Sequence, residues 1–250
     1  MPEGLDRLGS TALRRMGFDG PLGVRRTAFL DTETTGLMTG AGTVAFLVGL
    51  GSVEGDRFVV RQLFMSSYAD EGLLCERVAA LLRGKDALVT FNGKSFDAPL
   101  MASRFAMCRM ADPLAALAHL DLLHPARRAW KLRLQKCNLG HLEAEILGCP
   151  REGDLPGAEV PARYFEFLKT GDMAPVEDVL RHNLLDIRSL GSLLVRLAQV
   201  YGAPSEQTEI ADLFSLGRAL ERGGEREEAG RLYRMAARPQ PATSIRSLRA

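Results

Sequence analysis

The chain has 250 residues, of which 46% are hydrophobic and 25% are charged, and its formal net charge at pH 7 is +1. This composition is typical of a globular protein with one sizeable domain and room for a small addition. The near-neutral charge excludes a strongly basic or acidic chain, so any surface for nucleic acid must be a local patch.

The sequence indicates neither a membrane segment nor a secretory signal. The longest apolar stretch, near residues 44–50, is far too short to span a bilayer. The N-terminus has no apolar core of the signal-peptide type. The four cysteines form no C-x-x-C pair, which is typical of reduced thiols. We therefore expect a cytoplasmic protein with no membrane partner.

The N-terminal part predicts an extension followed by strands. The first 25 residues are rich in glycine and arginine with weak periodicity, and we expect them to lie on the main domain. A strand over 27–31 follows. Two β-rich runs, 43–53 and 57–65, flank the turn sequence 54–56, which is typical of a hairpin.

Helices and strands then alternate. Ser66 and Ser67 can cap a helix that runs to Arg83, with Gly84 as its stop. The later predicted elements are a strand over 87–91, a helix over 96–107, a strand over 119–123, and helices over 139–147, 162–169 and 175–201. Three strands, then single helices alternating with strands, then helices only, predict an α/β fold with a mixed β-sheet flanked by helices.

The C-terminal part has a different pattern. The sequences L-x-x-L-G-x-x-L at 213–220 and A-x-x-x-Y-x-x-A at 229–236 resemble one tetratricopeptide unit, with a break at Gly223-Gly224. A single unit cannot bury its faces alone. We expect it to pack on the main domain or to receive a partner helix, and a plain helical hairpin is the alternative.

Two acids separated by one residue end the first predicted strand. Asp31 and Glu33 would project from the same face of that strand. Carboxylates crowded in this way repel each other unless a cation lies between them. Oxygen ligands of high charge suit Mg²⁺ or Mn²⁺ rather than zinc. The alternative is an acidic turn after a strand.

Two further motifs carry acids. Asp97 ends the sequence F-N-G-K-S-F-D at 91–97, where a strand gives way to a helix, although a helix start favours a carboxylate for its own reasons. His182 and Asp186 are four residues apart in the long helix and share one face. Taken alone, such a pair is commonly a surface ion pair.

In this order, the motifs D-x-E, N-x-x-x-F-D and H-x-x-x-D resemble those of the DEDD exonucleases, which have an RNase H-like fold. The segments 119–131, 155–161 and 170–172 are similar to the YprB-type ribonuclease H-like family, and the resemblance extends over about residues 25–200. It implies a metal-dependent 3′–5′ exonuclease acting on DNA, on single strands or frayed ends, in repair alongside a helicase or another repair protein. The expected units are an extension (1–25), an RNase H-like exonuclease domain (26–201), a tetratricopeptide-like hairpin (207–238) and a disordered tail (239–250).

The resemblance also implies a site for two Mg²⁺ or Mn²⁺ ions. Asp31 would bridge both ions, Glu33 and Asp186 would complete the first, and Asp97 would hold the second through water. His182 would orient or deprotonate the attacking water.

The third motif departs from the family pattern. Three residues separate His182 from Asp186, whereas the superfamily has a histidine with four intervening residues or a tyrosine with three. Arg181 stands where a tyrosine is expected in YprB-type sequences. The helical spacing still places His182 near Asp186.

Substrate contacts are expected near both early motifs. By resemblance, Leu37 matches a wedge position that splays terminal bases, and Gly36 would let the backbone approach the terminal nucleotide. Asn92 and Phe96 of the second motif are assigned to the substrate as well. A further acid, Asp121, is expected to bond neighbouring backbone rather than a metal.

Basic residues crowd around the single tryptophan, Trp130. They are Arg127, Arg128, Lys131, Arg133 and Lys136. Basic side chains can hold phosphates and an aromatic face can stack on a base, so we assign Arg127, Arg128, Trp130 and Lys131 to the substrate. The alternative is a solvated helix with Trp130 anchored in the core.

Other functions stay open at this point. An RNA exonuclease or a structure-specific endonuclease would use the same carboxylates. A non-catalytic RNase H-like scaffold could recruit partners through the terminal hairpin, but it would have no need of four clustered charges.

Overall fold

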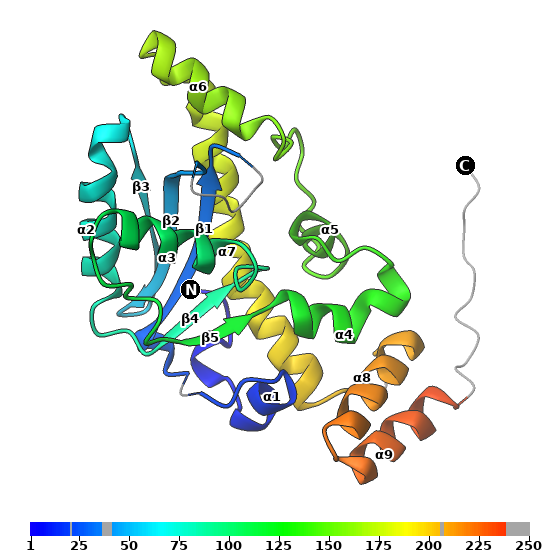
Figure 1. Cartoon of the computed structure of the whole chain (residues 1–250). Coiled ribbons are helices and arrows are strands. Elements are labelled where there is room, and N and C mark those ends of the chain that lie inside the picture. Colours follow the sequence, from blue (N-terminus) through cyan, green and yellow to red (C-terminus); the bar gives the residue numbers. More distant parts are fainter. Residues whose placement is uncertain (21, 37–41, 206–207, 239–250) are drawn as a thin grey trace, which may run out of the picture.

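The computed structural model describes residues 1–20, 22–36, 42–205 and 208–238. Its centre is a five-stranded mixed sheet with the order β3-β2-β1-β4-β5 (Figure 1). The strands are β1 (Thr27–Thr34), β2 (Ala45–Glu54), β3 (Arg57–Phe64), β4 (Ala87–Thr90) and β5 (Ala118–Asp121). β1, β2 and β3 pair antiparallel, whereas β4 is parallel to both β1 and β5.

Helices connect and flank the strands. In chain order they are η1 (Leu5–Arg7), α1 (Ser10–Arg15), η2 (Val24–Arg26), η3 (Tyr68–Asp70), α2 (Glu71–Leu82), α3 (Asp97–Met107), α4 (Leu123–Leu134), α5 (Leu139–Glu145), α6 (Val160–Thr170), α7 (Ala174–Gly202), α8 (Ile210–Arg222) and α9 (Arg226–Ala236). The predicted α/β fold, a mixed sheet flanked by helices with helices at the C-terminal end, is confirmed. No helix in the described ranges is long and apolar enough to cross a membrane.

Alternation along β1 divides the core into two layers. Ala28 and Leu30 pack with residues of α2 and α3 on one face of the sheet. Phe29 packs with Ile187 and Leu190 of α7 on the other face. Because side chains alternate along a strand, Asp31 and Glu33 continue the Phe29 side. The acids at the end of β1 therefore face the long helix α7.

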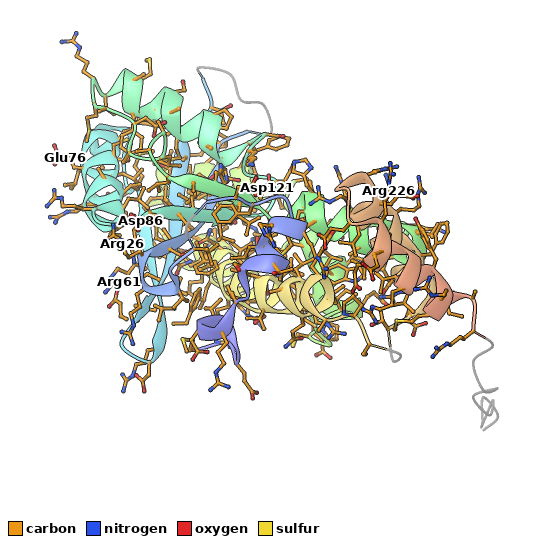
Figure 2. The ribbon with its side chains drawn as sticks, turned by 90° about the horizontal axis from the view of Figure 1, so that it is seen from below. Arg26, Arg61, Glu76, Asp86, Asp121 and Arg226 are labelled. Carbon is orange, nitrogen blue, oxygen red and sulfur yellow. The ribbon has the colours of Figure 1, made fainter. Side chains whose placement is uncertain are left out.

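The parallel register of β1 and β4 is fixed where both strands begin. The guanidinium of Arg26 forms an ion pair with Asp86 (Figure 2), and the Asp86 backbone N–H donates to the Arg26 carbonyl at 2.8 Å. With this register, Phe29 lies beside Val89. The carboxyl ends of β1 and β4 therefore meet at the opposite edge of the sheet, beside the start of α3.

Two predicted boundaries shift for identifiable reasons. The strand predicted over 119–123 ends at Asp121, because the Asp121 carboxylate accepts the Leu123 backbone N–H at 3.0 Å and the chain turns into α4. The helix predicted from Ser67 begins instead with η3, where the Ser67 side chain accepts the Ala69 N–H at 3.1 Å.

The N-terminal segment and the helices α8 and α9 pack on the central body. α1 lies against α7, and Leu13, Met16 and Phe18 are buried in the core. The predicted C-terminal hairpin is present as α8 and α9, and α8 packs on α4. A Cβ atom at Gly217 of α8 would lie 2.6 Å from the ring of Tyr233, so only glycine allows this close approach. The resemblance of the hairpin to a tetratricopeptide unit stays a prediction.

Candidate active site

The fold brings the predicted acids together at the carboxyl end of β1. Asp31 and Glu33 come from β1, Asp97 begins α3, and Asp186 comes from α7. The Asp97 carboxylate accepts the backbone N–H of Thr32 at 3.1 Å and its hydroxyl at 2.6 Å. Since Thr32 separates Asp31 from Glu33, these bonds fix the start of α3 beside the D-x-E motif.

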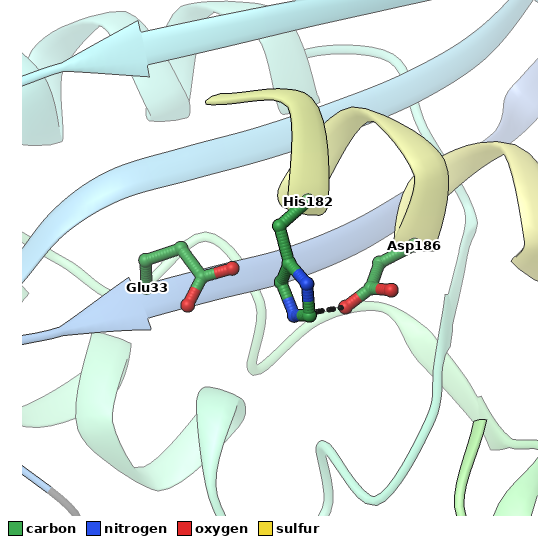
Figure 3. A group of neighbouring side chains, drawn as sticks. All are labelled: Glu33, His182 and Asp186. Atoms are coloured by element: carbon green, nitrogen blue, oxygen red, sulfur yellow. Dashed lines mark ion pairs between the residues drawn. The ribbon is translucent and has the colours of Figure 1, made fainter. Parts of the chain in front are cut away.

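Glu33, His182 and Asp186 form a compact group that could hold a metal ion (Figure 3). One ligand atom from each residue lies within 4.8 Å of the others, and His182 Nε2 is 3.6 Å from Asp186 Oδ2. The three-residue spacing of the third motif therefore still delivers the imidazole to the acids. The group also makes His182 a candidate ligand, a role that the sequence prediction gave only to carboxylates.

Asn183 is a site residue that the sequence prediction missed. Its Nδ2 donates to Asp31 Oδ2 at 2.9 Å, and its Oδ1 accepts from Gln62 Nε2 at 3.0 Å. The side chain is fully buried. Its position three residues before Asp186 in a helix puts both on one face, and this signal could have identified it.

Gly49 of β2 makes room for Asn183. Gly49 pairs with Asp31 across the β1–β2 ladder. A Cβ atom there would overlap the Asn183 amide and come within 2.9 Å of Ile187 Cγ1. The glycine therefore lets α7 approach the sheet closely enough for Asn183 to reach Asp31.

Burial and mutual repulsion raise the pKa values of the acids. Burial is the largest cause for each, and it lifts the pKa of Asp31 well above its ordinary value, with the charges of Asp186, Asp97 and Glu33 adding to it. The pKa of Glu33 rises to about 8 and that of Asp97 to about 6. A bound cation would favour the ionised form of these carboxylates and offset their repulsion, so the site is suited to a cation.

Arg151 supplies positive charge to the site from the loop between α5 and α6. Its guanidinium pairs with Asp186 and with the buried Glu143, and its Nη1 lies 3.1 Å from Asp154 Oδ2. Burial raises the pKa of Asp186, whereas Arg151 and His182 oppose that rise. Among the described residues, Glu143 Oε2 and Arg151 Nε are buried without a hydrogen-bond partner. Neither Arg151 nor Glu143 stands in a motif that the sequence prediction used.

A cleft of about 540 Å³ opens beside the acids. Its lining residues are Asp31, Phe91, Asn92, Leu123, Arg127, Lys131, Gln135, Lys136, Cys137, Asn138, Leu139 and Asp186. Predicted substrate residues from two segments that are distant in the sequence, Asn92 from one and Arg127 and Lys131 from the other, thus share a cleft with two of the acids. Both basic side chains are exposed.

The structure contradicts the stacking role of Trp130. The residue is 1% exposed and packs in the core, so its ring is not available to a base. The alternative interpretation, a helix with Trp130 as its anchor, is the one observed. Arg128 is half-buried and donates to the Met16 carbonyl, so it holds the N-terminal segment instead of facing the cleft.

The remaining predicted residues lie as follows. Gly36 is half-buried just after β1, and Phe96 is 48% exposed at the N-cap of α3. Leu37 lies outside the described residues. Asp121 accepts the backbone N–H groups of Asn92 at 2.7 Å and Lys94 at 3.1 Å, which is the structural role expected for it.

Comparisons with known proteins agree with this fold. A family model of the RNase_H superfamily matches residues 28–198, and the chain belongs to this family. The chain is 39% identical over 188 residues to the uncharacterized protein YprB of Bacillus subtilis (strain 168). This match covers 72% of the chain and 45% of YprB, so the chain spans less than half of that relative's length.

Two solved structures are similar in shape. The family B DNA polymerase of Pyrobaculum calidifontis aligns with 79% of this chain and 29% of its own, at 17% identity and a TM-score of 0.54. This similarity shows the fold. A product-bound exonuclease I covers 62% of this chain and 46% of its own, at 16% identity and a TM-score of 0.41.

The raised pKa values predict how stability depends on pH in chelator. Between about pH 4.5 and pH 8 the folded protein keeps a proton on Glu33 that the unfolded chain releases. The free energy of unfolding should therefore fall as pH rises through this window. Glu33→Gln should flatten the fall and raise the melting temperature at pH 8, measured by differential scanning fluorimetry.

The control is Glu76→Gln, which changes an exposed carboxyl on the outer side of α2 (Figure 2). It should reproduce the wild-type curve. A Glu33→Gln curve as steep as that of the wild type would mean that Glu33 ionises freely in the folded protein.

Replacement of Gly49 should disturb the site through packing. Gly49→Ala places a methyl group against Asn183, so we expect a loss of about 1–3 kcal/mol of stability, as for other overpacked cores. Urea unfolding measures this loss. Gly55→Ala at the hairpin turn is the comparison. No atom lies within 4 Å of its added methyl group, but φ is +62°, so a loss of stability there reports backbone strain without a clash.

Proposed function

We propose that this chain is a metal-dependent 3′–5′ exonuclease that hydrolyses phosphodiester bonds of DNA by a two-metal-ion mechanism. One observation carries the proposal: four acids and a histidine from three separate motifs converge beside a cleft that exposed basic side chains line. Membership of the RNase_H superfamily supports a nuclease. The substrate would be single-stranded DNA or frayed 3′ ends.

The donor set fits hard divalent cations. The acids of the site offer only carboxylate oxygens, which suit Mg²⁺ or Mn²⁺. Asp31, Glu33, Asp97 and Asp186 are the residues that would hold two such ions. Bound there, the ions would supply a nucleophile at neutral pH and stabilise the charge of an in-line displacement.

The chain's own side chains would transfer the proton and bind the substrate phosphates. His182 would accept the proton of the attacking water, because its imidazole lies among the acids and imidazole is the side chain that most often acts as a general base. Burial lowers the pKa of His182, but the negative charges of Asp186, Asp154 and Glu33 outweigh it, so the net pKa is raised. Arg127 and Lys131 would hold phosphates of the incoming strand.

The terminal nucleotide of the DNA strand would bind near the carboxyl end of β1 and the start of α3. Gly36, Asn92 and Phe96 are the proposed contacts there, and Leu37, which lies outside the described residues, is proposed as a contact by resemblance alone. A role in repair, beside a helicase, is proposed for the whole protein. RNA exonuclease and structure-specific endonuclease activities would use the same site, and the cleavage assay with DNA and RNA substrates would detect either one. A non-catalytic scaffold that recruits partners through α8 and α9 is the alternative if no substrate is cleaved.

The test is cleavage of end-labelled single- and double-stranded DNA and RNA with Mg²⁺, Mn²⁺ or EDTA. We expect single-nucleotide products from the 3′ end of DNA with either metal and none in EDTA. Asp31→Asn and Asp186→Asn should abolish cleavage, and His182→Ala should slow it about 10²–10⁴-fold. Cleavage in excess chelator by the folded protein would exclude the two-metal mechanism.

The basic side of the cleft predicts the salt dependence of DNA binding. Each lost phosphate contact should reduce the slope of log K against log salt by roughly one unit. Arg127→Glu combined with Lys131→Glu should therefore weaken binding and flatten its salt dependence, measured by fluorescence anisotropy with a catalytically inactive Asp31→Asn background.

Arg77→Glu combined with Arg83→Glu is the matched control, because both are exposed basic residues, Arg77 on α2 and Arg83 at its C-terminal end. It changes the net charge in the same direction without touching the cleft. Equal effects of the two double charge reversals would assign the binding to overall charge instead of the α4 surface.

A further inference from the structure

A further carboxylate contacts the other ring nitrogen of His182. His182 Nδ1 lies 2.8 Å from Asp154 Oδ1, in the loop between α5 and α6. The other oxygen, Asp154 Oδ2, lies 3.1 Å from Arg151 Nη1. Asp154 therefore bridges the imidazole and the guanidinium, with one oxygen for each.

These contacts determine which imidazole nitrogen carries the proton in the neutral ring. A guanidinium only donates hydrogen bonds and a carboxylate only accepts them. Arg151 Nη1 lies 3.4 Å from His182 Nδ1, which is long for a hydrogen bond, whereas the 2.8 Å contact with Asp154 is in the normal range. The contacts therefore place a proton on Nδ1, donated to Asp154, and leave the Nε2 lone pair directed at the site.

The same arrangement places Nε2 among the acids. His182 Nε2 is 3.6 Å from Asp186 Oδ2, and Glu33 completes the group (Figure 3). We propose that Asp154 is the positioning residue of His182: it selects the Nδ1–H tautomer and the ring orientation that aims Nε2 at the space between Glu33 and Asp186. This proposal rests on the proposed function for its catalytic consequence, but the tautomer itself does not.

Arg151 holds Asp154 in place. Its side chain is 9% exposed and pairs with Asp186 and Glu143 as well as with Asp154. The loop is thereby held to α7 at two points, Asp186 and His182. A histidine on a helix with a free ring could rotate about its side-chain bonds and interconvert its tautomers. The fixed carboxylate removes that freedom, and an outer partner of this kind typically changes activity by about 10–100-fold.

The first readout is independent of activity. The chain has four histidines, so ¹⁵N-histidine labelling gives signals from four imidazole rings. The signals that disappear in His182→Ala are those of His182. Long-range ¹H–¹⁵N spectra in the pH range where the ring is neutral should show His182 protonated on Nδ1. Asp154→Leu, which keeps a similar volume without an acceptor, should give a mixture of tautomers, and Asp154→Asn should restore part of the Nδ1–H form. An unchanged Nδ1–H signal in Asp154→Leu overturns the proposal.

The second readout separates positioning from folding. Asp154→Leu should lower kcat about 10–100-fold with little change in KM. In a His182→Ala background the same change should have almost no further effect, because its target is gone. Equal losses in both backgrounds would assign Asp154 a structural role and contradict the proposal. Glu152→Gln, an exposed acid two residues away, is the matched control and should leave kcat and the spectra unchanged.

The two proposals fail in different ways. Tautomer loss in Asp154→Leu without any nuclease activity in the wild type would retain the positioning role and reject the exonuclease. Normal exonuclease activity in the wild type, with an unaltered tautomer in Asp154→Leu, would retain the exonuclease and reject the positioning role. Melting curves of each variant show that the compared proteins are folded, and Asp154→Asn supplies the comparison if Asp154→Leu is not.

Discussion

Repulsion between buried carboxylates is the constraint on which the rest of this structure depends. Asp31, Glu33, Asp97 and Asp186 meet in one region beside the cleft, and the pKa of each is above its ordinary value, with burial as the largest cause. Such a group costs stability unless positive charge or hydrogen-bond donors accompany it. The chain supplies both in part, through Arg151 and through the amide of Asn183.

The fold tolerates this cluster because the surrounding framework is rigid. β1 has partners on both sides, and its Arg26 end is tied to Asp86 at the start of β4. Parallel pairing brings the carboxyl ends of β1 and β4 to one edge, so Asp97 arrives beside the D-x-E motif. On the other face, Gly49 lets α7 lie close to the sheet. The four acids come from three elements, β1, α3 and α7, and the packing of these elements on one another holds the acids together.

Periodicity explains why these parts could be predicted. Alternation in a strand placed Asp31 and Glu33 on one face, and helical spacing placed His182 beside Asp186. The same rule could have identified α4, since its residues Ala126, Ala129 and Trp130 are buried while Arg127 and Lys131 are exposed. The many basic residues around Trp130 obscure this helical pattern in the sequence. Arg151 and Asp154 were beyond this reasoning. They stand in a loop without a repeat, and their partners lie 35 and 28 positions away in the chain.

The two oxygens of Asp186 show how the cluster divides its work. Oδ1 pairs with Arg151, whereas Oδ2 lies 3.6 Å from His182 Nε2. One oxygen thus accepts a charge-assisted contact from within the chain, and the other faces the histidine of the site. Because Arg151 also holds Asp154, which in turn contacts His182 Nδ1, a single guanidinium links the charge of a candidate ligand to the orientation of the candidate base. Loss of that cation would disturb both, which ties the loop between α5 and α6 to the chemistry although no motif marks it.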